Sequence, residues 1–234
     1  MAHGHPVRLA KLLNAQLPAQ GFQILETIPH PTPTRDFNNV VLKIKAQNPD
    51  LVIPASYYNE YVLLARTMQQ QQVKLKGIYS VLGGAASSYK FVKEFPEAAK
   101  YIMDCNHWFD PRNPKAVALK KTVEDKGQFY TYEVYMNYSC IMLVADALQR
   151  AASADRAKLT DALQRGASAD RAKLTEALAS STFAGHLMPY GPTKFVNGQN
   201  EGAAPVNTQV LDNDIKVILP ATFANAKPVF PMPA

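Results

Sequence analysis

Short apolar runs and longer amphipathic stretches alternate along the first half of the chain. The apolar runs have the length of buried strands and lie at 22–28, 51–55, 77–81 and 101–108. Between them, apolar residues recur at helical spacing: Phe37, Val40, Val41 and Ile44 fall at i, i+3, i+4 and i+7. Asp36 precedes this stripe and is typical of a helix cap. The alternation predicts an α/β fold with a parallel sheet flanked by helices.

The pattern changes after Trp108. Two long helices and a final pair of strands are expected at 114–126, 132–150, 206–211 and 215–220. Asp212-Asn213-Asp214 is typical of a hairpin turn between the last two strands. We therefore expect the chain to leave one lobe and return to it, in three segments: 1–109 (an α/β lobe), 110–189 (helices of a second lobe) and 190–234 (returning strands and a tail).

One stretch of the chain is doubled. Residues 146–160, DALQRAASADRAKLT, recur as residues 161–175 with Ala151 replaced by Gly166. A solenoid needs at least about three repeats of roughly 20 residues or more, so two copies of this length do not build one. We interpret the doubled stretch as a tolerated tandem duplication on the outer face of the second lobe.

Composition narrows the function classes. The 234 residues are 47% apolar and 19% charged, which is typical of a globular protein, and the net charge of +6 comes from scattered basic residues. Scattered charges favour a solvated surface over a nucleic-acid interface. We interpret Cys105 and Cys140 as two buried thiols in preference to a disulfide bond. The most apolar stretch, 134–145, is too short to cross a bilayer, which takes about 20 residues, and the first residues lack the pattern of a signal peptide.

Candidate binding residues follow the predicted strands. Ligands of parallel sheets bind at the carboxyl ends of the strands, where helices begin. The residues at such positions are His5, Ser56, Tyr57, Tyr58, Gly83 and Gly84. Free N–H groups at helix starts suit a carboxylate, and Tyr57 is the stronger tyrosine candidate because it lies off the apolar stripe. Two alternatives remain open: Tyr58 belongs to the core, and Gly83-Gly84 is only a turn.

The sequence contains no catalytic constellation. Its five histidines are dispersed, and neither a GxSxG elbow nor an HExxH helix is present. There is also no GxGxxG or phosphate loop that would hold a nucleotide. We therefore expect no catalytic residues, no metal site and no cofactor, and a protein that is not an enzyme.

Several blocks stand in a characteristic order: RDFNNVVLKIKAQNPDLVI, the stretch 48–114 from NPDLVIPASYYNE onwards, TYEVYMNYSCIMLVADAL and MPYGPTKFVNGQNEGAAPVNTQVL. In order and spacing they resemble the periplasmic substrate-binding proteins of branched-chain amino acid-type ABC transporters. This is the Leu/Ile/Val-binding protein family, which has the type I periplasmic binding fold. The resemblance runs from about residue 6 to about residue 220.

The resemblance implies a small ligand held between two lobes, an ABC transporter permease as partner, and a periplasmic location. It implies that Tyr57 faces the ligand from the carboxyl-terminal lobe and that His5 lies near the rim. Amino-acid binders of this family carry an acid after the next strand, but residues 79–84 contain none. Because an unpaired buried ammonium is costly, we expect an aromatic or other organic carboxylate, with a branched-chain amino acid as the alternative.

The resemblance also implies a preceding amino-terminal lobe that this sequence lacks, so we expect a truncated chain with impaired ligand binding. Helix 132–145 would then expose an apolar face, which predicts self-association. Two other functions remain open: a ligand-sensing domain on the same fold and, less favoured for want of catalytic residues, an amide hydrolase-type enzyme.

Overall fold

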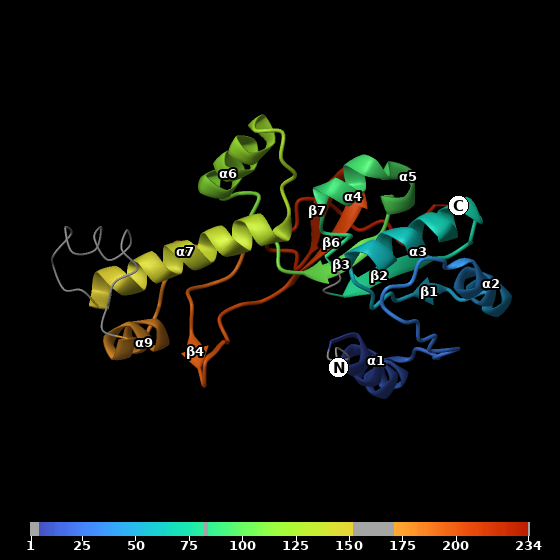
Figure 1. Cartoon of the computed structure of the whole chain (residues 1–234), viewed down its shortest axis with the longest axis horizontal. Helices are drawn as coiled ribbons and strands as arrows, with labels where there is room; N and C mark the ends of the chain where they lie inside the picture. Colours follow the sequence, from blue (N-terminus) through green and yellow to red (C-terminus); the bar gives the residue numbers. More distant parts are fainter. Residues whose placement is uncertain (1–4, 82–83, 152–170, 234) are drawn as a thin grey trace. The chain divides into compact units, whose positions relative to one another are not determined.

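The computed structural model describes residues 5–81, 84–151 and 171–233 (Figure 1). The chain divides into two compact units. Unit 1 comprises Met1–Asn106 and Val206–Ala234, and unit 2 comprises His107–Pro205. Each unit buries apolar side chains of its own.

A five-stranded sheet forms the centre of unit 1. Its strands, in spatial order, are β1 (Leu51–Val52), β2 (Gly77–Val81), β3 (Met103–Asn106), β6 (Val206–Leu211) and β7 (Asp214–Leu219). The first three are parallel, whereas β6 pairs antiparallel with both β3 and β7. The predicted α/β fold is confirmed, with one correction: the sheet is mixed rather than parallel. The β6–β7 pairing is antiparallel because the hairpin turn between these strands reverses the chain.

Six helical segments belong to unit 1: α1 (His5–Gln16), the 3-10 helix η1 (Pro18–Gln20), α2 (Asn38–Gln47), α3 (Tyr58–Gln70), α4 (Tyr89–Glu94) and α5 (Pro96–Ala99). The predicted stripe of α2 is confirmed, since Phe37, Val41 and Ile44 are buried. The Asp36 carboxylate accepts a hydrogen bond from the backbone N–H of Asn38 at 2.7 Å and so caps the helix start.

Residues 22–28 do not form the strand that their composition predicts. Strand β1 pairs with β2 on one side, and within the described residues no strand pairs with its other edge. Without a neighbour to complete its backbone hydrogen bonds the segment forms no ladder, and Phe22, Ile24 and Leu25 stay exposed. That prediction was wrong because strand formation depends on a partner, which local composition does not report.

The hairpin between β6 and β7 is confirmed. Leu211 pairs with Asp214, and the two residues between them, Asp212 and Asn213, have φ values of +52° and +57°. A two-residue loop with both φ values positive is the turn whose twist matches that of paired strands. Asn and Asp adopt this conformation more readily than most residues, which explains why the sequence signal was reliable.

Several hydrogen bonds hold the C-terminal tail to the sheet, and the buried Gln209 side chain makes three of them. The Gln209 amide nitrogen donates to the backbone oxygens of Tyr101 and Val229, and its oxygen accepts from Val229 N–H at 2.8 Å. Beyond it, Met232 N–H donates to the Lys76 carbonyl oxygen at 2.8 Å. The tail thus lies along the starts of the sheet strands, away from their carboxyl ends.

Unit 2 is mainly helical where it is described. Its elements are α6 (Pro114–Asp125), α7 (Tyr132–Ala151), α9 (Arg171–Ala179) and the short pair β4 (Phe195–Val196) and β5 (Gln199–Asn200). Its centre is a cluster of aromatic rings from Trp108, Phe109, Tyr130 and Tyr135, all at most 4% exposed. Residues 152–170, which make up most of the doubled stretch, lie outside the described residues.

Both cysteines are free thiols, so the expectation of no disulfide is confirmed. Cys105 is partly buried, but Cys140 is exposed on α7, which corrects the expectation that both are buried. Among the described residues, no helix combines the length and the apolar character needed to cross a bilayer.

Candidate functional site

The candidate site lies in unit 1, where β1 leads into α3. Tyr57 is the residue just before the helix; its backbone is extended, and its side chain is 49% exposed. The first hydrogen bond of the helix runs from Tyr61 N–H to the Tyr57 carbonyl at 2.8 Å. The N–H groups of the residues between them have no partner inside the helix, as at any helix start. Tyr57 therefore presents a flat apolar ring at the N-terminal end of α3, where the helix dipole is positive.

Ser56, next to Tyr57, is 7% exposed, and its hydroxyl lies 2.9 Å from Nε2 of His30. His30 comes from the loop before α2, where its ring meets the edge of Phe37 at 5.0 Å between centroids. Sequence reasoning missed this contact, because 26 residues separate the two partners. The only local signal was a histidine opening the proline-rich run HPTPT.

The other predicted site residues are less well supported. Tyr58 is the first residue of α3 and is partly buried. Gly84 is buried and has φ +77°, as expected of the turn alternative, whereas Gly83 lies outside the described residues. His5 is the first residue of α1. The structure does not bring His5 together with Ser56 and Tyr57 through any contact that it records.

An acidic residue stands at the start of α3, which the sequence analysis did not weigh. Glu60 lies in the first turn and is 5% exposed. No lysine or arginine in the described parts of the chain forms an ion pair with it. A carboxylate in the first turn is favoured by the helix dipole, but it reduces the attraction of the same helix end for an anion. Glu60 therefore weakens the argument for a carboxylate ligand at this point.

A buried polar cluster lies between α3 and the sheet. Asp104 on β3 is 0% exposed and lies beside Ser80 of β2 in the strand register. Ser87 and Asn106 donate hydrogen bonds to its Oδ2. Its Oδ1 has no hydrogen-bond partner among the described residues, nor do the Ser80 and Tyr61 hydroxyls. Burial raises the pKa of Asp104, and the hydrogen bonds only partly oppose this effect.

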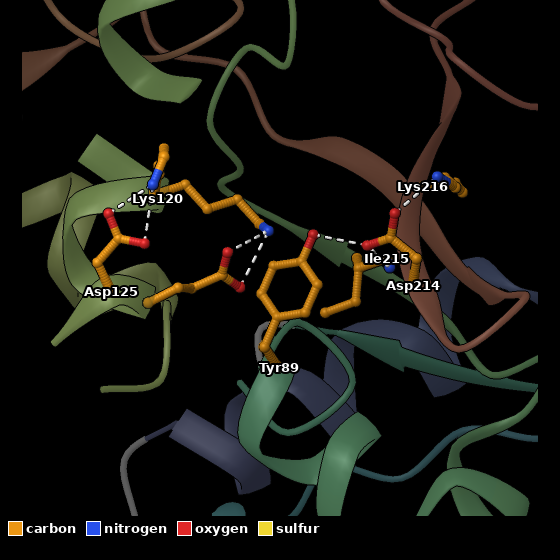
Figure 2. A network of polar contacts seen from close by, with 8 residues as sticks. Tyr89, Lys120, Asp125, Asp214, Ile215 and Lys216 are labelled. Atoms are coloured by element: carbon orange, nitrogen blue, oxygen red, sulfur yellow. Dashed lines mark hydrogen bonds and ion pairs between the residues drawn. The ribbon is translucent and has the colours of Figure 1, made fainter. Parts of the chain in front are cut away.

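Asp214, at the start of β7, shows the opposite behaviour. Tyr89 and the Ile215 N–H donate to its Oδ1 at 2.8 Å, and Lys216 donates to Oδ2 at 2.6 Å (Figure 2). Burial alone would raise the pKa of Asp214, but the hydrogen bonds from Lys216 and Tyr89 and the charge of Lys216 lower it overall. Asp214 thus fastens the hairpin to α4, and its contacts do not suggest an acid–base pair.

The described residues contain no group of three or more histidine, cysteine, aspartate or glutamate side chains placed to hold a metal ion. The site offers a tyrosine ring, a serine hydroxyl, the N-terminal end of a helix and one buried carboxylate. These groups suit the reversible binding of a small polar ligand.

Solved structures resemble this chain over nearly its whole length. The leucine binding protein LivK of Thermotoga maritima matches with a TM-score of 0.69 and 20% identity, over 92% of this chain and 56% of its own. A protein described as a branched-chain amino acid ABC transporter from Silicibacter pomeroyi matches with a TM-score of 0.70 and 17% identity, over 97% and 58%. A solute-binding protein of Rhodopseudomonas palustris, solved with benzoate, matches with a TM-score of 0.64 and 15% identity. The match covers 95% of this chain and 53% of that protein.

These identities establish the fold alone, and the chain spans little more than half the length of each of these proteins. No curated protein sequence matches it. The family model described as periplasmic binding protein, however, matches residues 3–214. This match covers most of the chain. The chain therefore belongs to the periplasmic binding protein family.

Proposed function

We propose that this chain is the solute-binding component of an ABC uptake transporter, or a piece of it, and that it binds a small organic acid at the start of α3. The observation that carries the proposal is Tyr57, an aromatic side chain left half exposed at the start of α3. An exposed tyrosine at such a position offers a ligand both an apolar ring face and a hydroxyl group. A permease partner and a periplasmic location follow from the family and form part of the same proposal.

The ligand class rests on two observations. Residues 79–84 contain no acid to pair with an ammonium group, and the related protein of Rhodopseudomonas palustris was solved with benzoate. Both favour an aromatic carboxylate. The second candidate is a branched-chain amino acid, which the buried and unpaired Glu60 favours because its carboxylate could balance an ammonium group.

Replacing Tyr57 by alanine should weaken ligand binding roughly tenfold, since an aromatic contact contributes about 1.4 kcal/mol. Calorimetric titration with benzoate and with leucine measures the change and also decides between the two ligand classes. Tyr57→Phe should retain most of the affinity. Phe129→Ala is the control, because it removes an exposed aromatic ring from unit 2 that belongs neither to this site nor to α7. Equal affinities for wild type and Tyr57→Ala would contradict the proposed site.

Self-association is also part of the proposal. Along α7, Tyr138, Ile141 and Val144 are 43, 68 and 39% exposed at helical spacing, and they form one apolar stripe. We expect a second copy of the chain to cover this stripe, because contiguous exposed apolar surface drives association.

Ile141→Glu should shift the chain toward the monomer mass of 25.8 kDa in light scattering. The substitution places a charge on the stripe, while a side chain that is 68% exposed contributes little to the fold. Val117→Glu on α6, at 48% exposure, is the control and should leave the mass unchanged. A wild-type chain that is already monomeric would contradict the proposal.

A further inference from the structure

The hydrogen bonds around His30 determine which ring nitrogen carries the proton. Nδ1 lies 3.1 Å from the Pro31 carbonyl oxygen, which can only accept. It also lies 3.3 Å from the Thr34 hydroxyl, which donates its only hydrogen to the same Pro31 oxygen. Both neighbours of Nδ1 therefore act as acceptors, so Nδ1 is the protonated nitrogen of the neutral ring.

This assignment fixes the direction of the hydrogen bond on the other side of the ring. Nε2 lies 2.9 Å from the Ser56 hydroxyl. In the neutral ring Nε2 carries no hydrogen, so Ser56 must donate its single hydrogen to it. Toward a ligand, Ser56 can then only accept a hydrogen bond. When His30 gains a proton, Nε2 becomes the donor, and the Ser56 hydrogen is released for an acceptor such as a carboxylate.

We propose that His30 is a positioning residue that sets the direction of the Ser56 hydroxyl, so that binding of a carboxylate ligand takes up a proton at Nε2 of His30. This inference rests on the proposed function, since it assigns a role within the same site. Binding of a ligand that donates at this point, such as an ammonium or hydroxyl group, would take up no proton and would favour the neutral ring.

Few charged groups can interfere with this arrangement. The loop of His30 carries Arg35 and Asp36, both exposed, and Asp36 is engaged with the start of α2. Glu60 is the acidic group in the first turn of α3, the helix that follows Ser56. Within the described residues, none of these three forms a hydrogen bond or an ion pair with the imidazole. The hydroxyl of Ser56 is therefore the group that responds most directly to protonation of Nε2.

Benzoate is the probe for this inference, titrated calorimetrically from about pH 8 to about pH 5.5. As the pH is lowered, the dissociation constant for benzoate should fall by up to about tenfold per pH unit over the range in which the free ring is neutral. The heat of binding, compared between buffers of different ionisation enthalpy, should show the uptake of one proton. His30→Gln should bind with a dissociation constant that no longer varies with pH, because its amide can donate to Ser56 at every pH. Ser56→Ala should lose the pH dependence together with the low-pH affinity.

His107→Gln is the matched control, because it removes a histidine of unit 2 and should leave the pH dependence intact. Imidazole ¹⁵N NMR of the unliganded chain provides a second readout, in which the neutral His30 ring should carry its proton on Nδ1. A proton on Nε2 would overturn the inference whatever the ligand does. Equal benzoate affinity at both ends of the pH range would overturn proton uptake and leave the proposed function standing. If benzoate does not bind at any pH, a carboxylate ligand at this site is contradicted as well.

Discussion

Replacing Tyr135 by alanine should lower the free energy of unfolding of unit 2 by about 3–5 kcal/mol, the usual cost of truncating a buried aromatic side chain. The Tyr135 ring lies 5.4–5.6 Å from the ring centroids of Trp108, Phe109 and Tyr130. Its hydroxyl also donates to the His107 carbonyl at 2.9 Å. The substitution would leave a cavity at the meeting point of three rings and remove this hydrogen bond.

Trp108 is the only tryptophan of the chain and lies inside this cluster, so its fluorescence during urea denaturation reports on unit 2. Tyr135→Phe keeps the ring and should cost only about 0.5–1.5 kcal/mol, the value of one hydrogen bond. Hydrogen exchange of β2, β3, β6 and β7 should stay at the wild-type level in both variants. An alanine variant as stable as the phenylalanine variant would show that the ring cluster is not the core of unit 2.

The fold was predictable where the signal is local. The stripe of α2, the long helix α7 and the Asp212-Asn213 turn each depend on residues within a few positions of one another, and each was predicted correctly. Strand pairing is not local: Asp104 pairs with Thr208, about a hundred residues away, and local alternation does not report the direction of that pairing. For this reason the sheet was predicted to be parallel although it is mixed. For the same reason a strand was predicted at residues 22–28, which have no partner strand.

The site was predictable in part for the same reason. Tyr57 could be identified because it follows an apolar run and lies off the stripe of the next helix. His30 could not, since its place beside Ser56 depends on how an irregular loop folds back. The sequence alone could have drawn attention to Glu60, because an acid in the first turn of a helix lowers the affinity of that helix end for anions. The burial that makes Glu60 significant appears only in the folded chain.

Replacing Asp104 by asparagine should stabilise the chain at about pH 8 and have little effect below about pH 4. Burial raises the pKa of Asp104 above its ordinary value of 3.8, so the folded state favours the protonated acid. The stability contributed by that protonated form is present below the unfolded pKa and is lost as the pH rises through the folded pKa. Asparagine remains neutral and avoids this loss. Its oxygen can accept from Ser87, and its NH₂ group can face the Ser80 hydroxyl.

The expected gain at about pH 8 is about 1–3 kcal/mol, the cost of leaving a buried polar group such as Oδ1 unpaired. Urea denaturation followed by circular dichroism measures it at each pH. Asp214→Asn is the matched control with the opposite sign. Because the pKa of Asp214 is lowered, its contribution is present above the unfolded pKa and is lost as the pH falls through the folded pKa, so this variant should be destabilised at neutral pH. Destabilisation of Asp104→Asn at about pH 8 would contradict this prediction. It would mean that Asp104 is ionised and fully paired in the folded chain, whereas the prediction depends on an Oδ1 atom without a partner.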